Sequence, residues 1–444
     1  MDLRDRAMPV PVAELADEAT ATVRRWLDAA ALIESPASES RLNELLADPA
    51  GADFAIGFVY GVLRPDDLRV AGRNLESLSH SIPDALPWYS ELGAQFAGGF
   101  ASLLPAPMVP LARDAFLRTV GPLLIRLDGP ELGKQLAELA EPGGIRPVLA
   151  PVTAVASGRR EADRQVADAR ELLARPDVPT VSISLSSVVG RPRLVDLDGV
   201  VDHAVELLEP LCELAGRPGK SIEFDVQRLD ELELTLRVMT RLGNHHPELE
   251  LGIGLPSYLP ESLPTADDLA SWARKRTNAR APLTIRVTKG EQLGEEHAEA
   301  LRRGIPAAPV ASRLETDAQF LRIIDRLLTP ALAGTVRVVV ATHNLFDAAW
   351  AWRLARRRRV ERSLEHEFML GLATSQAAAA RRDLGGIRVY APVVQHGQLG
   401  LAIPYLVRRL RDLAAGDRAG DFLSLAAPSP SVRPLPEAGT ASNP

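Results

Sequence analysis

The chain has 444 residues, of which 46% are hydrophobic and 25% are charged, the proportions of an ordinary soluble globular protein. A formal net charge of −7 argues against a general nucleic-acid-binding protein. The only cysteine, Cys212, cannot form an internal disulfide, so we expect a buried structural thiol and a cytoplasmic location. We expect no signal peptide at the amino terminus, and no run of about 18 apolar residues predicts a membrane span.

Residues 1–140 are predicted to form an N-terminal helical arm. Apolar side chains recur there at helical spacing, as at Leu15, Val23, Trp26, Leu27 and Ala30. Prolines are expected to divide the region into short helices, and no strand is expected in it. These prolines are Pro65, Pro83, Pro87, Pro105, Pro107 and Pro110.

Residues 141–425 follow a different, alternating pattern. Short β-branched or apolar runs occupy residues 145–152, 180–186, 221–226, 250–255, 283–288, 336–341, 364–369 and 387–391. Amphipathic stretches follow them near 159–176, 197–216, 228–242, 264–280, 291–330 in two pieces, 345–358, 373–384 and 398–414. Strands that alternate with helices pair in parallel, so these eight units predict an α/β fold, a closed (βα)8 TIM-type barrel.

An open, doubly wound sheet is the main alternative for residues 141–425. Such a sheet typically has a glycine-rich turn after its first strand, and no predicted strand is followed by one. Residues 426–444 are rich in Pro, Ser, Ala and Gly and are predicted to be a disordered tail.

Polar side chains gather at the carboxyl ends of the predicted strands, where the active site of such a barrel lies. A charged side chain in an apolar strand is costly to bury unless it is paired. Several of the predicted strands carry such a charged side chain, which predicts a functional site at the carboxyl end of the barrel. The alternative is a barrel rim held together by salt bridges. The residues are Asp225, Ser257, Tyr258, Arg286, Lys289, Thr342, His343, Asn344, Glu365, Glu367 and Tyr390.

Arg408, Arg409 and Asp412 lie on the last predicted helix. The two guanidiniums reach a common point only if this helix crosses the barrel mouth, where they would hold a carboxylate bidentately. Asp412 is spaced to pair with Arg408 at i,i+4. A solvated helix face is the alternative. We expect no metal, because His203, His297 and the strand carboxylates have no metal-ligand spacing.

Several stretches resemble the proline dehydrogenase family, most closely the proline dehydrogenase half of actinobacterial bifunctional enzymes. They are 221–236 (SIEFDVQRLDELELTL), 285–290 (IRVTKG), 341–344 (ATHN), 387–392 (IRVYAP), 405–412 (YLVRRLRD), 57–67 (GFVYGVLRPDD) and 86–93 (LPWYSELG). The resemblance extends to about residue 425, without a counterpart of the aldehyde-dehydrogenase half. It implies a distorted (βα)8 barrel that binds FAD and transfers a hydride from proline to flavin N5, giving pyrroline-5-carboxylate in proline catabolism.

The resemblance also implies roles for single residues. Arg408 and Arg409 match the pair that binds the proline carboxylate, and Asp412 replaces the glutamate that supports this pair. Tyr390 matches the tyrosine that lines the proline ring, and Asp225 matches the aspartate that hydrogen-bonds it.

The cofactor positions follow in the same way. Arg286 matches the arginine near flavin N5. Lys289, Thr342 and His343 match positions along the FAD ribityl chain, pyrophosphate and adenine, and Met369 also lies among the cofactor-binding positions. The usual electron acceptor is a membrane quinone, which implies peripheral membrane contact, and the companion enzyme would be a separate glutamate-semialdehyde dehydrogenase.

Three positions depart from the family pattern. Ser184 stands in place of a lysine on the second strand, Pro256 in place of a flavin-contacting glutamine, and Ala154 in place of a glutamate after the first strand. Serine lacks the reach and charge of lysine, and proline has no amide side chain or backbone donor. These changes support the alternative of a catalytically degenerate homologue that acts as a binding or regulatory protein. A barrel lyase or aldolase with Lys289 as Schiff-base amine is a third hypothesis.

Overall fold

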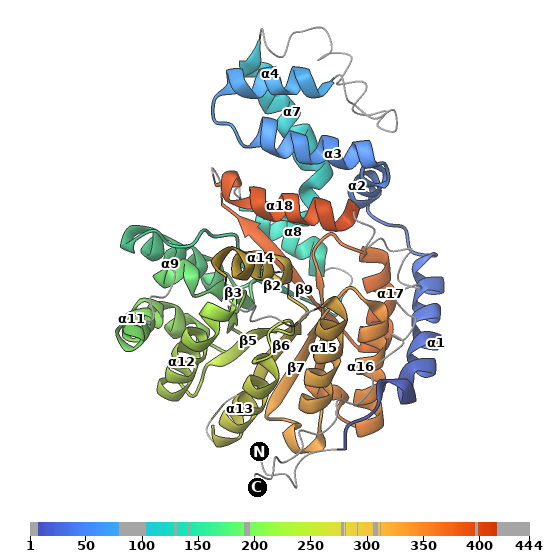
Figure 1. Ribbon diagram of the computed structural model, residues 1–444, viewed down its shortest axis with the longest axis vertical. Helices are drawn as coiled ribbons and strands as arrows, with labels where there is room; N and C mark the ends of the chain where they lie inside the picture. The colour runs from blue at the N-terminus through green and yellow to red at the C-terminus, as the bar shows by residue number, and fades with distance from the viewer. Residues whose placement is uncertain are drawn as a thin grey trace.

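Parallel strands close into a barrel in the computed structural model of the chain (Figure 1). The strands run in the order β1-β9-β2-β3-β4-β5-β6-β7-β8, and pairing of β9 with β8 completes the ring. Their bounds are Ile125–Arg126 (β1), Ile145–Pro151 (β2), Thr180–Ser184 (β3), Ser221–Asp225 (β4), Glu250–Pro256 (β5), Leu283–Thr288 (β6), Val336–Ala341 (β7), Leu364–Met369 (β8) and Ile387–Val394 (β9). The structure describes residues 8–79, 104–127, 131–140, 143–190, 196–276, 279, 281–290, 292–304, 310, 312–395 and 398–414.

Helices follow the barrel strands and surround them, which confirms the predicted (βα)8 architecture. Their bounds are Arg159–Ala174 (α9), Ser186–Val189 (α10), Leu197–Ala215 (α11), Leu229–His245 (α12), Ser262–Lys275 (α13), Leu293–Arg303 (α14), Arg313–Leu327 (α15), Leu345–Arg358 (α16), Thr374–Leu384 (α17) and Leu399–Ala414 (α18). Short 3-10 turns occupy Pro330–Leu332 and Glu361–Ser363. Side-chain caps begin several helices; Asn344 Oδ1, for example, accepts from the amides of Phe346 and Asp347 at the start of α16.

Strand β4 alternates between an apolar outer face and a polar inner face. On β4, Ile222 and Phe224 are fully buried against the surrounding helices in the main hydrophobic core. Glu223 and Asp225, the alternate residues, instead join ion pairs with arginines of other barrel strands. The apolar layer between strands and helices therefore stabilises the barrel, and charged side chains occupy its interior.

The N-terminal region divides between two hydrophobic cores. Helix α1 (Val12–Ala30) packs on α16 and α17, and its Trp26 belongs to the barrel core. The second core joins α18 to α2 (Ala37–Ala47), α3 (Pro49–Phe58), the π-helix Val59–Leu63, α4 (Leu68–Ser79) and α7 (Pro105–Val120). A 3-10 turn (Gly121–Leu123) and α8 (Glu131–Ala140) complete the region. Figure 1 shows α18 between this bundle and the barrel.

Two predictions for the N-terminal region are wrong. Ile125 and Arg126 form strand β1, because the end of β9 offers backbone partners at Val393 and Val394. Pro107 and Pro110 do not break the chain but lie inside α7, which begins at Pro105. Pro105 and Pro107 stand in the first turn, which tolerates proline because its backbone N–H groups have no helical acceptor, whereas Pro110 lies further inside the helix. Pro83, Pro87 and residues 86–93 lie outside the described residues, as does the predicted tail 426–444.

Cys212 is buried on α11, as predicted, and burial raises the pKa of its thiol to about 12. In the described part of the chain, no helix by itself has the length and apolarity to cross a membrane. One pair, Ala37–Ala47 with Pro49–Leu63, reaches them only when joined across a bend of 111°.

Candidate active site

Asp225, the last residue of β4, meets Arg286 of β6 and Tyr390 of β9 inside the barrel. The Tyr390 hydroxyl donates to Asp225 Oδ2 at 2.7 Å. The Arg286 guanidinium pairs with the other oxygen of Asp225 and lies over the Tyr390 ring, 4.7 Å from its centroid. One carboxylate thus orients both the phenol and the cation, as the sequence predicted for Asp225 and Tyr390.

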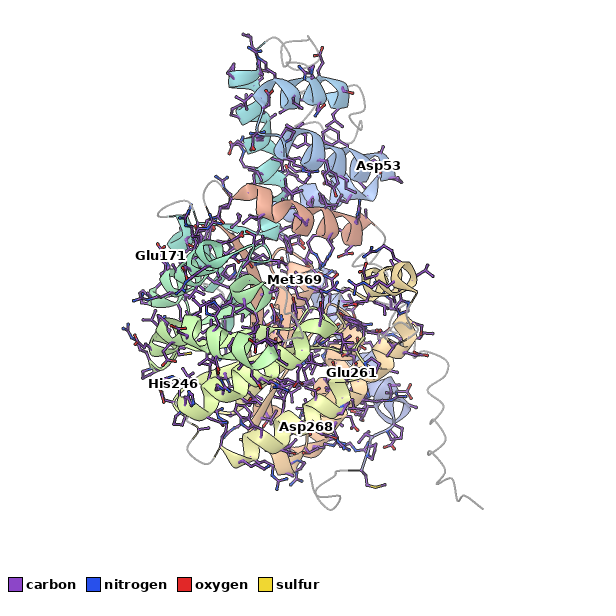
Figure 2. The ribbon with its side chains drawn as sticks, turned by 60° about the vertical axis from the view of Figure 1, so that its left-hand side comes forward. Asp53, Glu171, His246, Glu261, Asp268 and Met369 are labelled. Carbon is purple, nitrogen blue, oxygen red and sulfur yellow. The ribbon has the colours of Figure 1, made fainter. Side chains whose placement is uncertain are left out.

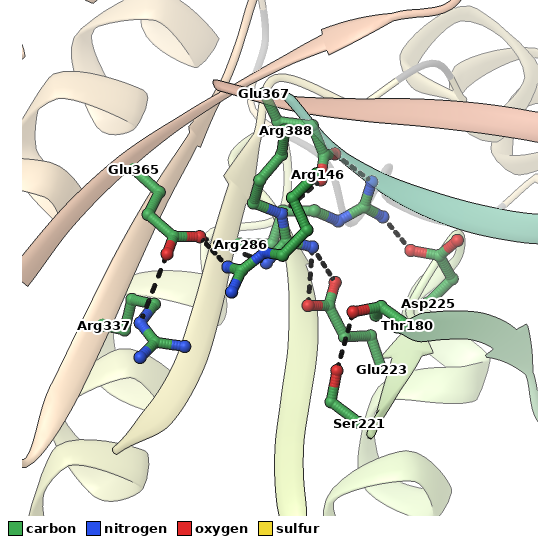
Figure 3. A network of polar contacts seen from close by, with 10 residues as sticks. All are labelled: Arg146, Thr180, Ser221, Glu223, Asp225, Arg286, Arg337, Glu365, Glu367 and Arg388. Atoms are coloured by element: carbon green, nitrogen blue, oxygen red, sulfur yellow. Dashed lines mark hydrogen bonds and ion pairs between the residues drawn. The ribbon is translucent and has the colours of Figure 1, made fainter. Parts of the chain in front are cut away.

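A larger network of ion pairs extends from this cluster through the barrel interior (Figure 3). Glu367 Oε1 accepts from Arg286 Nη1 at 2.9 Å, and its Oε2 accepts from Arg388 Nε at 3.1 Å. Arg388 Nη2 donates to both oxygens of Glu223 at 2.6 Å. The Glu223, Glu367 and Arg388 side chains are each 3% exposed or less.

Glu365 lies at the other end of this network. It is the second residue of β8 and pairs with Arg146, the second residue of β2, with Arg337, and with Arg388 Nη1 at 3.7 Å. Its side chain is 26% exposed. The prediction that Glu365 belongs with the carboxyl-end residues is therefore wrong, because it stands two positions before Glu367, near the start of β8.

Two glycines of β5 leave room for the charged side chains. A Cβ added to Gly252 would lie 2.7 Å from Glu223 Cγ. A Cβ added to Gly254 would lie 3.0 Å from both Arg286 Nη2 and Asp225 Oδ1. Strand β5 therefore contributes empty space where its neighbours contribute long side chains.

Gly254→Ala is expected to lower kcat/KM by about 10- to 100-fold, because the new methyl group pushes Arg286 and Asp225 apart and misplaces both. Steady-state kinetics of the purified variant measures the loss. Gly294→Ala is the control, since nothing lies within 4 Å of a Cβ at this exposed helical position. Equal activity in the two variants would show that the Arg286–Asp225 pair needs no exact placement.

Helix α18 crosses the carboxyl end of the barrel and brings Arg409 to its rim. Arg409 is buried, and its Nη1 lies 3.3 Å from Sδ of Met369, the last residue of β8. Figure 2 shows Met369 directly beneath this helix. Arg409 Nη2 pairs with Asp412 Oδ2 at 2.9 Å, and its guanidinium lies 5.8 Å from the Tyr405 ring centroid.

Arg408 precedes Arg409 on α18 and is partly buried. The pairing of Asp412 with Arg409 is at i,i+3, whereas the sequence suggested an i,i+4 pair with Arg408. The helix crossing that the sequence required for the two arginines is present, because α18 contacts both β9 and the N-terminal helices α2 and α3. The solvated-face alternative does not hold for Arg409.

His343 follows β7 and has a defined tautomer. Its Nε2 accepts from the Met369 amide at 3.0 Å. Burial, together with the charge of Arg409, lowers the pKa of His343 to about 4, so the ring is neutral near pH 7. A neutral ring whose Nε2 accepts carries its hydrogen on Nδ1. This Nδ1 is buried and has no hydrogen-bond partner within the described part of the chain.

Two buried histidines predict a loss of stability in mild acid. Burial also lowers the pKa of His366, to about 4, although its Nε2 contacts the Ala348 carbonyl at 3.0 Å. The unfolded chain binds these protons near pH 6.5 and the folded chain only near 4, so stability is full above 6.5 and falls below it. The shift corresponds to about 3 kcal/mol for each histidine.

Urea unfolding from pH 7 to pH 4 measures this effect. His366→Gln is expected to lose less stability over that range than the wild type, by about 3 kcal/mol. His245→Gln, at an exposed position, is the control and should follow the wild-type curve. Parallel curves for all three proteins would contradict the assignment to buried histidines.

Lys289, which follows β6, is held by two aspartates. Its Nζ lies 2.7 Å from Asp317 Oδ1 on α15 and 2.8 Å from Asp347 Oδ2 on α16. Burial alone would lower the pKa of Lys289, but the two carboxylates outweigh it and raise the pKa above its ordinary value. A Schiff-base lysine needs a lowered pKa, so this environment argues against the lyase or aldolase hypothesis.

The remaining predicted positions also lie at the strand ends. Thr342 is buried, and its Oγ1 accepts from the Asn344 amide at 3.0 Å. Ser184 ends β3 beside Asp225 of β4 and shares a hydrogen bond of 2.8 Å with Ser186. Pro256 ends β5, and its carbonyl accepts from Ser262 Oγ at 2.7 Å.

Ala154, in the loop after β2, is partly buried. Nearby in this loop, the Ala156 amide donates to the Ser186 carbonyl at 2.9 Å, so the loop lies against the segment that follows Ser184. Two of the three divergent positions therefore belong to adjacent segments of the rim.

The sequence interpretation missed Glu223 and Arg388. Each stands two residues before a predicted site residue, Asp225 and Tyr390 respectively. Because side chains on a strand repeat every second residue, this spacing places them on the same inner face and was a usable signal. Among the described residues, no group of three or more His, Cys, Asp or Glu side chains is placed to hold a metal ion.

Comparisons with known proteins agree with the motifs. The family model described as proline dehydrogenase matches residues 145–415, more than half of the chain. Two curated relatives, the bifunctional proteins PutA of Salmonella typhimurium and Escherichia coli, are 29% and 28% identical over 252 and 249 residues. Each alignment covers 53% of this chain, and the chain spans only 18% of the length of these relatives.

Solved structures give the same result. Proline utilization A (PutA) from Corynebacterium freiburgense is 35% identical with a TM-score of 0.64, over 71% of this chain and 32% of that one. PutA from Bdellovibrio bacteriovorus, inactivated by N-propargylglycine, is 18% identical with a TM-score of 0.74 and supports the fold alone; the match covers 93% of this chain and 44% of that one. The resemblance inferred from the motifs is confirmed.

Proposed function

Because the chain belongs to the proline dehydrogenase family, we propose that it is an FAD-dependent oxidoreductase that oxidises proline or a related cyclic amino acid. The product would be the cyclic imine, pyrroline-5-carboxylate in the case of proline. The observation that carries the proposal is the convergence of Asp225, Arg286 and Tyr390 beneath Arg409 at one end of the barrel.

The residues at the strand ends are compatible with a flavin dinucleotide. Two buried N–H groups, His343 Nδ1 and Arg286 Nε, have no acceptor within the described part of the chain. An unsatisfied buried donor costs about 1–3 kcal/mol, which favours a ligand with acceptors at this place. FAD offers such acceptors in its ring carbonyls, ring nitrogens and phosphates. When bound, it would supply the hydride acceptor of the oxidation.

The chain's own residues bind and orient the substrate. Arg409, with Arg408 beside it, is suited to a carboxylate, since guanidiniums bind carboxylates through parallel hydrogen bonds. Tyr390 offers a flat ring wall for an aliphatic ring, and Asp225 holds that wall in place. Helix α18 covers this end of the barrel with its buried Leu406 and Leu410 in the second core, which limits the access of water.

FAD uptake and turnover together test the proposal. Purified protein reconstituted with FAD is expected to retain the flavin through gel filtration and to reduce an electron-accepting dye when proline is added. Mass spectrometry should then detect the cyclic imine. Protein that takes up no flavin contradicts the proposal.

A second function, that of a binding or regulatory protein, is favoured by the three divergent positions. Ser184 engages Ser186 where the family has a cation, and Pro256 offers only its carbonyl. Restoring both residues in Ser184→Lys/Pro256→Gln distinguishes the two functions. A catalyst is expected to keep or raise its turnover, whereas a degenerate homologue has no turnover before the change.

We also propose a membrane quinone as electron acceptor, a cytoplasmic location with peripheral membrane contact, and a separate glutamate-semialdehyde dehydrogenase as companion enzyme. The relatives' printed name, bifunctional protein PutA, is in keeping with a second activity that accompanies the first. Reduction of a soluble quinone analogue by proline in the presence of the protein tests the acceptor.

A further inference from the structure

Glu367 is shared between two arginines that come from different strands. Its oxygens accept from Arg286 Nη1 at 2.9 Å and from Arg388 Nε at 3.1 Å. The Glu367 side chain is 2% exposed and that of Arg388 is 3% exposed. At such burial the interaction is little screened by water, so the position of this carboxylate constrains both guanidiniums strongly.

The far side of Arg388 is fixed by Glu223. Both oxygens of Glu223 accept from Arg388 Nη2 at 2.6 Å, and Glu223 in turn fills the space that Gly252 leaves empty. Arg388 therefore cannot follow Glu367 if the latter moves, and it acts as a fixed support. The chain of contacts runs from Glu223 through Arg388 and Glu367 to Arg286 (Figure 3).

Arg286 is held at both ends of its guanidinium. Glu367 holds Nη1, Asp225 holds Nη2, and the flat face lies 4.7 Å from the centroid of the Tyr390 ring. Asp225 alone would leave the guanidinium free to turn about a single contact. The second carboxylate removes this freedom and offsets the positive charge of Arg286.

We propose that Glu367 is a positioning residue for Arg286: it fixes the guanidinium beside Tyr390 and sets the local charge felt by the cofactor. This role rests on the proposed flavin function. A cation near a redox centre favours the electron-rich reduced form, and a paired carboxylate reduces that preference. Loss of the Glu367 charge therefore makes the bound flavin easier to reduce.

Glu365 provides a matched control on the same strand. It lies two residues earlier on the same inner face and is 26% exposed; it pairs with Arg146 and Arg337 and lies 3.7 Å from Arg388 Nη1. Glu367→Gln is expected to raise the ratio of reduced to oxidised flavin at a fixed potential by at least about tenfold, which is about 30 mV for a two-electron couple. Glu365→Gln is expected to leave the potential of the FAD-loaded protein unchanged. Equal potentials in the two variants overturn the inference.

The coupling between Glu367 and Arg286 is measurable without flavin. In urea unfolding of the apoprotein, Glu367→Gln and Arg286→Lys are expected to be non-additive by about tenfold in the unfolding equilibrium constant, whereas Glu365→Gln and Arg286→Lys are expected to add. Additivity at both positions contradicts the inference. If Glu367→Gln does not fold, Glu367→Asp replaces it in the unfolding experiment, because its shorter side chain cannot reach both arginines.

Different experimental outcomes contradict the proposed flavin-dependent function and the proposed role of Glu367. A wild-type protein that takes up no FAD contradicts the proposed function and, with it, the effect of Glu367 on a flavin. The wild-type protein could instead bind FAD, and both Glu367→Gln and Glu365→Gln could show the wild-type reduction potential. That result would contradict only the role of Glu367.

Discussion

Arg409→Met is expected to lower kcat/KM for proline by about 10²- to 10³-fold, because truncating one partner of a buried charge pair costs about 2–5 kcal/mol. Arg409 is buried at the barrel rim against Met369, where it is placed to bind a substrate carboxylate. The carboxylate does not change charge during the oxidation, so the interaction is similar in ground and transition states. The loss is therefore expected mainly in KM.

Arg411→Met is the matched control for this prediction. Arg411 lies on the same helix and is exposed. The same substitution there removes one positive charge without reaching the barrel mouth. Similar kcat/KM values for the two variants would mean that Arg409 does not bind the carboxylate, whereas a loss confined to Arg409→Met supports that role. Arg409→Lys adds a finer test, since a lysine keeps the charge but not the planar fork.

Asp225→Asn is expected to lower kcat by about 10²- to 10³-fold and the free energy of unfolding by about 3 kcal/mol. Asp225 joins the Tyr390 hydroxyl to the Arg286 guanidinium, and its side chain is only 10% exposed. An asparagine keeps the shape but removes the charge, which leaves Arg286 compensated by Glu367 alone. The asparagine NH2 group would also face the Arg286 guanidinium or the Tyr390 hydroxyl, both of which donate to Asp225 in the wild type, so two donors would meet.

Asp230→Asn and Tyr390→Phe complete that experiment. Asp230 is exposed at the start of α12 and pairs with Arg228, so its variant should keep wild-type kinetics and stability. Tyr390→Phe removes only the hydroxyl and should cost less stability than Asp225→Asn. Kinetics and urea unfolding measure both effects. Unchanged kcat in Asp225→Asn would show that the site does not depend on this carboxylate.

Much of the fold follows from local patterns in the sequence. The run 221–226 predicted β4 (Ser221–Asp225), and the last two amphipathic stretches predicted α17 and α18, because side-chain periodicity is a property of each segment alone. Strand β1 was missed because two residues carry no periodicity and owe their extended form to β9. Helix α7 was missed as a single element because proline in a first turn gives the same signal as proline in a loop.

The site was predictable where a residue stands at a strand end and not where its partner comes from elsewhere. The family resemblance implied that Asp225 hydrogen-bonds Tyr390, and it does. The two aspartates that hold Lys289 lie on α15 and α16, and nothing in their local sequence distinguishes them from surface acids. Glu365 was predicted at the carboxyl end of the barrel. The alternation of side chains along a strand predicts which face a side chain occupies, but not its position along the barrel axis.

Anaerobic reduction of the FAD-loaded protein tests the central claim most directly: that α18 places an arginine pair over the barrel mouth to hold a substrate carboxylate against the flavin. Absorbance of the oxidised flavin is followed as proline or pyrrolidine, the same ring without its carboxylate, is added. We expect bleaching by proline and little or none by pyrrolidine. An absorbance that proline leaves unchanged, or that pyrrolidine bleaches equally well, would contradict it.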